Sequence, residues 1–100
     1  MNNIQCYNDR IIFKEKKGIF RKKYTDREIM LMNVKNVLKA VENEELISIS
    51  FFLTNDEEIN FPVAEYLNVS DVLKIILENR DNYTYIIEEF DINTCESKRI

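Results

Sequence analysis

Strict alternation of apolar and polar residues in one segment, ELISISFFLTNDEEINFPV (45–63), limits what this chain can fold into more than any other feature. Side chains of a β-strand point alternately to opposite faces, so this period of two predicts a strand with one buried face. The polar TNDEE is typical of a turn, and the alternation returns after it, which predicts an antiparallel hairpin. Pro62 cannot donate a backbone hydrogen bond, so the returning strand should lie at a sheet edge or end there. The residues expected to point inward are Ile47, Ile49, Phe51, Leu53, Ile59 and Phe61.

A second hairpin is predicted at RIIFKEKKGIFRKKY (10–24), where two apolar-bearing runs flank Lys17-Gly18 and the glycine can adopt a positive φ. A loop with an even number of residues would place on one face Ile11, Phe13, Phe20 and Tyr24. The opposite face would then carry Ile12 and Ile19 together with the basic residues Lys14, Lys16, Arg21 and Lys23.

The segment NVSDVLKIILENRDN (68–82) predicts an amphipathic helix over about 69–80. Asn68 is suited to cap its N-terminus, and Asp71 in the first turn interacts favourably with the helix dipole. The asparagines at 79–82 should end it. One stripe with helical spacing is expected to face the sheet: Val69, Val72, Leu73, Ile76 and Leu77.

The segment at about 27–44 has two interpretations. Spacings of three and four between Leu31, Val34, Leu38 and Val41 fit an additional amphipathic helix. The same stretch fits a short strand, a turn at Asn33 and a second strand through Val41. Asparagine is weak in a helix interior, but the residues alone leave both interpretations open.

The C-terminal residues predict one more strand at 83–92, where polar and apolar positions alternate, followed by a frayed tail at 95–100. One hundred residues with 45% apolar content make a single domain over 1–100. Since the chain has no apolar run near the ~20 residues of a membrane span and no secretion signal at its start, we expect a cytoplasmic protein. Cys6 and Cys95 have no metal-like spacing and should be free thiols, a disulfide between them being the less favoured alternative.

Charge is distributed unevenly along this acidic chain, whose net charge is −4. Residues 10–27 hold eight basic and two acidic residues, a net charge of +6. Residues 40–100 hold four basic and fourteen acidic residues, a net charge of −10. Such asymmetry favours a charged partner, or two faces of one domain that attract each other.

The order of these segments resembles the pleckstrin-homology-like superfold, including its small bacterial and GRAM-type members. A strand pair like RIIFKEKKGIFRKK comes first there, and a segment like EIMLMNVKNVLKAV follows, in which a strand reaches a short turn and resumes. A strand pair like LISISFFLTNDEEINFPV and a helix like VSDVLKIILEN complete the order. The resemblance covers about 5–80 and rests on strand order and apolar spacing.

This resemblance implies an α+β fold in which a half-open antiparallel β-barrel is capped by one helix at about 69–80. It favours strand, turn and strand for 27–44. The chain departs from the pattern because it lacks the tryptophan often found in the closing helix of eukaryotic members, and because it adds a strand after the helix.

Lipid-binding members of that superfold hold phosphate headgroups with basic residues around the first strand pair. The matching positions here are Lys14, Lys16, Lys17, Arg21 and Lys23. A phosphate needs several cations and exposed loop amides, and a short loop at Lys17-Gly18 offers few amides. The small bacterial members are more often protein-interaction modules.

Catalytic and metal-binding patterns are missing from the sequence. It has no histidine, and its paired carboxylates fall in turns or on solvated strand positions, so we expect no enzyme, no cofactor and no metal site. The expected function is that of a non-enzymatic adaptor or accessory module that binds a protein through a sheet edge or the basic hairpin at 14–23. A homo-oligomer is left open.

Two alternative functions remain. The hairpin could bind anionic lipid headgroups or nucleic acid, of which nucleic acid is disfavoured by the acidic remainder of the chain. The abundance of Asn, Lys, Ile and Glu also fits a small accessory protein of a mobile or viral element.

Overall fold

The structure, a computed structural model, describes residues 2–17 and 23–100, leaving aside the side chains of 16, 17 and 23. A three-stranded antiparallel sheet contains β1 (Gln5–Cys6), β2 (Arg10–Lys17) and β3 (Lys23–Met30). A five-stranded sheet, in the order β6-β5-β4-β7-β8, contains β4 (Val34–Glu42), β5 (Glu45–Leu53), β6 (Glu58–Pro62), β7 (Ile86–Asp91) and β8 (Glu96–Arg99). One α-helix, α1 (Val69–Glu78), completes an α+β fold, and the described strands do not close into a barrel.

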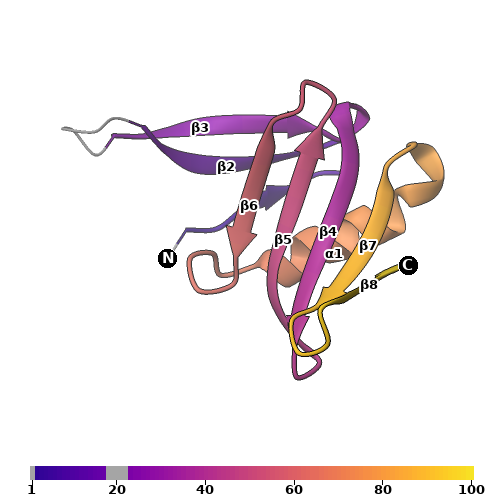
Figure 1. Cartoon of the computed structure of the whole chain (residues 1–100). Helices are drawn as coiled ribbons and strands as arrows, with labels where there is room; N and C mark the ends of the chain where they lie inside the picture. The colour runs from indigo at the N-terminus through magenta and orange to yellow at the C-terminus, as the bar shows by residue number, and fades with distance from the viewer. Residues whose placement is uncertain (1, 18–22) are drawn as a thin grey trace.

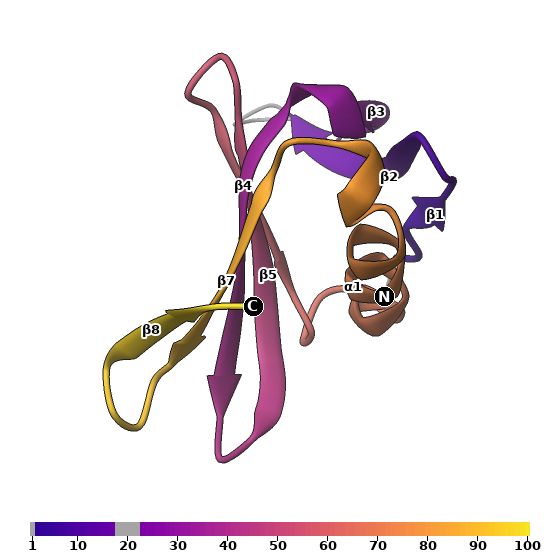
Figure 2. The same ribbon diagram turned by 90° about the vertical axis from the view of Figure 1, so that its right-hand side faces the viewer.

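The three-stranded sheet crosses one end of the five-stranded sheet, and α1 lies behind the latter (Figure 1). Figure 2 shows the five-stranded sheet edge-on, with α1 and β1 both on the same side of it. The other face of the five-stranded sheet is therefore not covered by any described element.

The hydrophobic core fills the space between the two sheets and the helix. Phe61 of β6 is fully buried and makes three edge-on ring contacts, with ring centroids 4.8 Å from Phe13, 5.6 Å from Phe51 and 5.2 Å from Tyr66. Phe13 belongs to the three-stranded sheet and Phe51 to the five-stranded sheet, so one side chain joins both sheets. Burial confirms five of the six inward positions predicted for 45–63, which are Ile49, Phe51, Leu53, Ile59 and Phe61.

The prediction for Ile47 was wrong, because its side chain is 37% exposed. The pairing of β4 with β5 slips between Ala40↔Ser48 and Val41↔Leu46, which leaves Ile47 as an extra residue in a β-bulge. Leu46 takes its place and packs against the core. The adjoining turn has two central residues, Asn43 and Glu44, both with positive φ.

The segment at 27–44 forms strands, so the alternative of an additional helix was wrong. β3 runs to Met30, a short 3₁₀ turn η1 (Leu31–Asn33) follows, and β4 resumes the extended chain. β4 lies in the middle of the five-stranded sheet and pairs with β5 on one side and β7 on the other. Both neighbours supply backbone hydrogen bonds, which outweigh the helical spacing of the apolar residues.

Helix α1 ends at Glu78, and a 3₁₀ turn η2 (Arg80–Asn82) follows it. Val69, Val72 and Ile76 are buried and Leu73 packs against the core, whereas Leu77 is 37% exposed and was wrongly placed on the stripe. Ile75 packs against the core instead.

Asn68 precedes the helix, as expected for a cap, but its side chain makes no capping hydrogen bond. Its Oδ1 accepts a hydrogen bond from the Ile4 amide at 2.7 Å, and its Nδ2 donates one to the Ile4 carbonyl at 2.6 Å. This one amide group therefore fastens the N-terminal segment beside the helix and holds the buried Ile4 in the core.

The C-terminal region contains two strands. β7 covers 86–91 of the strand expected at 83–92 and runs parallel to β4, which requires α1 as the crossover. Tyr85 lies just before β7, and its hydroxyl donates a 2.5 Å hydrogen bond to the Ile76 carbonyl. The frayed tail expected at 95–100 was wrong, because β8 pairs with β7 through Glu88↔Arg99 to Asp91↔Glu96.

The bulge provides a test of the fold with matched neighbours. Ile49→Asp buries a charge without a partner in a fully buried position and should lower the free energy of unfolding by at least ~4 kcal/mol. Ile47→Asp leaves its carboxylate at the surface and should cost less than ~1 kcal/mol. Chemical denaturation of both variants measures the difference, and equal losses would contradict the bulge.

Candidate interaction surfaces

The basic hairpin divides its cations between its two faces. Lys17 pairs with Lys23, so an odd number of residues, 18–22, connects β2 and β3. This register places Lys14 beside Asp26 and Lys16 beside Tyr24 on one face, because directly opposed residues of antiparallel strands share a face. Lys17 and Lys23 belong to the other face. The expectation that Lys23 shares a face with Lys14 was therefore wrong, while Arg21 and Phe20 lie outside the described residues.

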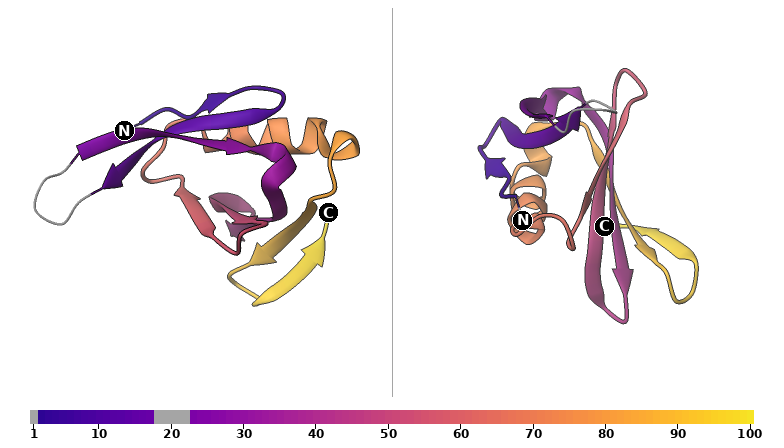
Figure 3. Two further views of the ribbon diagram at one scale, coloured as in Figure 1. Left: turned by 90° about the horizontal axis from the view of Figure 1, so that it is seen from above. Right: turned by 90° about the vertical axis from the view of Figure 1, so that its left-hand side faces the viewer.

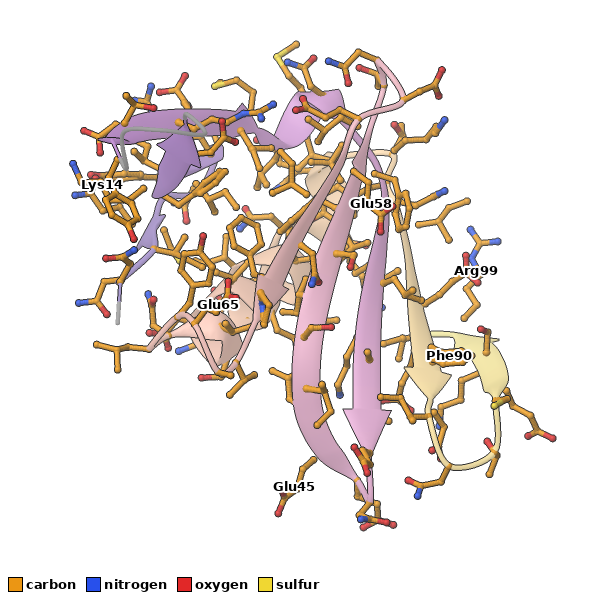
Figure 4. The ribbon with its side chains drawn as sticks, turned by 60° about the vertical axis from the view of Figure 1, so that its left-hand side comes forward. Lys14, Glu45, Glu58, Glu65, Phe90 and Arg99 are labelled. Carbon is orange, nitrogen blue, oxygen red and sulfur yellow. The ribbon has the colours of Figure 1, made fainter. Side chains whose placement is uncertain are left out.

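Carboxylates within the hairpin partner its described cations. The Lys14 Nζ lies 2.6 Å from the Asp26 Oδ1, on the exposed face seen in Figure 4. Arg10 Nη1 lies 3.3 Å from Glu28 Oε2 on the same face. These pairs offset part of the positive charge that a phosphate group would need, and the site predicted from Lys14, Lys16, Lys17, Arg21 and Lys23 is not assembled on one face of the strands.

Arg27 is the most enclosed cation of the hairpin. Its Nη1 donates to Glu15 Oε2 at 2.8 Å, and its Nη2 donates to Glu57 in the turn between β5 and β6. These hydrogen bonds, Glu57 first, raise the pKa of the Arg27 guanidinium above its ordinary value. Arg27 thus bridges the two sheets, a role that its position in a charged run did not reveal.

The uncovered side of the five-stranded sheet forms what we call the open face. The register sets its side chains in three rows, which in the order β6-β5-β4-β7-β8 are Glu58, Phe52, Asn36 and Ile86; then Asn60, Ser50, Leu38, Glu88 and Arg99; then Pro62, Ser48, Ala40, Phe90 and Ser97. Four larger apolar side chains of this face are half-buried: Leu38, Phe52, Ile86 and Phe90. A shallow pocket of ≈ 300 Å³ lies among residues that include Leu38, Phe52 and Glu88.

Charges stand at the two edges of the open face. Glu58 projects from β6, and Arg99 lies on β8 beyond Phe90, as Figure 4 shows. Within residues 2–17 and 23–100, neither Glu58 nor Arg99 takes part in an ion pair. A sequence search for alternating residues finds this face, but only the strand order shows which strands set its edges.

A second charged group lies on the helix side of the sheet. Glu89 of β7 sits between Lys39 of β4, at 3.2 Å, and Lys98 of β8, at 3.3 Å. Hydrogen bonds from Lys39 and then Lys98 hold the pKa of the Glu89 carboxyl below its ordinary value of 4.5. The group ties three neighbouring strands together.

The cysteines are free thiols in separate places. Cys6 lies near α1 in a pocket that also includes Asp71 and Lys74. Burial, together with the Asp71 carboxylate, raises the pKa of the Cys6 thiol, which disfavours the thiolate that a nucleophile requires. In the described part of the chain, no three Cys, Asp or Glu side chains gather closely enough to hold a metal ion.

Comparisons with known proteins identify no relative: no family model, curated protein or solved structure matches this chain. Among the described residues, no helix has the length and apolar character needed to cross a membrane. The argument for function therefore rests on the surfaces of the molecule.

Removing the Arg27 bridge should destabilise the protein measurably. Arg27→Met leaves two carboxylates without their shared donor, so we expect a loss of ~1–3 kcal/mol in the free energy of unfolding, smaller at high salt. Arg10→Met removes a more exposed pair of the same hairpin and should cost less than ~1 kcal/mol. Urea denaturation at low and high salt makes the comparison, and equal losses would contradict the bridge.

The Glu89 group predicts a specific pH dependence. Because its pKa is lowered by folding, the stabilisation should be complete above pH ~4.5 and should be lost as the pH falls through the folded pKa. The stability difference between the wild type and Glu89→Gln should therefore be constant near neutral pH and shrink below pH ~4.5. Glu88→Gln, which removes a carboxylate from the opposite face, is the control. A difference that stays constant down to pH 3 would contradict the assignment.

Proposed function

We propose that this protein is a non-enzymatic interaction domain that binds a protein partner through its open face. One observation carries the proposal: α1 covers a single side of the five-stranded sheet, while the other side presents half-buried apolar side chains from three adjacent strands (Figure 2). The larger apolar side chains sit on β5, β4 and β7, and polar or charged residues stand toward the edges. Apolar centres with polar rims are typical of protein interfaces.

The sheet edges are less suited to binding an added strand. β8 is short and fully exposed, and Glu96, Lys98 and Arg99 occupy three of its four positions. β6 ends with Pro62, which lacks a backbone donor. Charged and proline-containing edges discourage strand addition, so we place the partner on the open face rather than at an edge.

The basic hairpin is the alternative contact, for an acidic protein or for anionic lipid. Its positive charge supports this alternative, and the pairing of Lys14 with Asp26 weakens it. The division of the basic residues between two faces weakens it further, because fewer cations can reach one phosphate group.

We also propose that the chain is a divergent member of the pleckstrin-homology-like superfold. The pair β2–β3, the interrupted strand through η1, the hairpin β5–β6 and α1 follow one another in the order that the resemblance implies. The parallel strand β7 and the β7–β8 hairpin are additional to that order.

Capture experiments with matched variants test the proposed function. Tagged wild-type protein in native lysate should retain a protein that Phe52→Ser/Phe90→Ser fails to retain, because that variant removes two apolar side chains from the open face. Met32→Ser removes a 69% exposed apolar side chain elsewhere and should retain it. Circular dichroism verifies that each variant is folded, and mass spectrometry identifies the retained protein.

Other outcomes separate the alternatives. Capture that survives Phe52→Ser/Phe90→Ser but is lost in Lys14→Glu would move the contact to the hairpin. Binding to vesicles containing phosphatidylserine at ~0.15 M salt, lost in Lys14→Glu, would replace the proposal with lipid binding. Failure of the wild type to retain any protein would contradict the proposed function.

A further inference from the structure

We propose that the partner on the open face is a second copy of this chain, and that the two copies pack face to face about a two-fold axis parallel to β4. This inference rests on the proposed role of the open face as an interaction surface. Three observations carry it: the twist of the sheet, the order of the apolar side chains and the positions of the charges.

The twist makes the open face complementary to itself. Figure 2 and the right-hand view of Figure 3 both show the β5–β6 turn and the far end of the β7–β8 hairpin leaning toward the open side, at opposite corners of the sheet. A rotation of 180° about an axis along the central strand places each forward corner of one copy over a receding corner of the other. Two identically twisted sheets then nest at an even separation, as the layers of an aligned β-sandwich do.

The same rotation brings apolar side chains together. β4 is the middle strand of the order β6-β5-β4-β7-β8, so β5 of one copy faces β7 of the other and β6 faces β8. Phe52 and Ile86 occupy the same row, and Phe52 therefore faces the partner's Ile86, a contact that occurs twice by symmetry. Leu38, in the middle row of β4, faces the partner's Leu38.

The charges fit this arrangement. Arg99 faces the partner's Asn60, and the partner's Glu58 stands one row further, about 7 Å along the strand and within reach of an arginine side chain. Glu88 faces the partner's Ser50, so no two like charges meet. A two-fold axis perpendicular to the strands would set Arg99 against Arg99 and Glu88 against Glu88, and repulsion disfavours it.

The size of the open face predicts a weak dimer. Five strands about 4.8 Å apart and three rows of side chains give a footprint of roughly 500 Å². This is below the ~800 Å² per partner of a standard stable interface, so we expect dissociation constants in the micromolar range.

Charge exchange tests the geometry directly. Sedimentation equilibrium of the purified chain from about 1 to 500 µM should show a monomer–dimer equilibrium. Glu58→Arg and Arg99→Glu should each weaken it about tenfold or more, since symmetry applies each change twice, and the double variant should recover affinity to within about threefold of the wild type. Both side chains are exposed, so folding should be unaffected. Lys35→Glu, an exposed charge reversal off the open face, should leave dimerisation unchanged.

Cross-linking gives an independent readout. In a background of Cys6→Ser and Cys95→Ser, Leu38→Cys should give cross-linked dimers with a short bis-maleimide, because this position lies on the two-fold axis. Met32→Cys in the same background should give monomers.

Each remaining outcome decides the question. A chain that is monomeric throughout this range, or a double variant that fails to recover, would overturn the dimer. If the wild type is monomeric and a different protein is captured in lysate and lost in Phe52→Ser/Phe90→Ser, the second copy is excluded and the proposed function stands. If the chain dimerises but neither Phe52→Ser/Phe90→Ser nor the single reversals weaken it, both the open-face dimer and the proposed role of that face are overturned.

Discussion

The packing of Phe61 is the constraint on which the rest of the fold depends. Its ring lies between Phe13 and Phe51, and therefore between two sheets that share no strand. Phe61 belongs to β6, an edge strand whose backbone pairs only with β5, so the ring contacts hold its other side. Because this edge is committed to the core, the three-stranded sheet and α1 are both drawn to one side of the five-stranded sheet. The open face exists because every covering element is used on that side.

Local pattern predicted most of the strands and the helix, and it failed where neighbouring strands decide. The alternation at 45–53 gave the buried faces of Ile49 and Phe51, but the bulge that turns Ile47 outward arises from pairing with β4. The helical spacing at 27–44 misled because β4 receives hydrogen bonds from both sides. The tail at 95–100 has no apolar alternation of its own, and β7 supplies the pairing that orders it.

The candidate surfaces were harder to predict than the fold. The basic residues were visible in the sequence, yet their division between two faces depends on the length of the connection at 18–22. The open face needs strand order as well as alternation, since Phe52, Leu38 and Phe90 come from strands that are distant in sequence. Asn68 was recognised as a residue that stops a helix at its start, whereas its amide group binds Ile4 across 64 positions of sequence. Side-chain bonds of such long range leave no local pattern.

The parallel pairing of β7 with β4 has a consequence for how the molecule assembles. The hairpins β2–β3 and β5–β6 join residues close in sequence and can form early, whereas Asn36 meets Ile86 only after the intervening hairpin and helix are in place. Until then β4 is a bare edge, with Val37 and Leu38 beside unpaired amides and carbonyls. A nascent or partly unfolded chain therefore passes through a stage in which its most apolar strand can recruit a strand from another molecule. The late docking of β7 and β8 closes that edge and ends the period in which aggregation competes with folding.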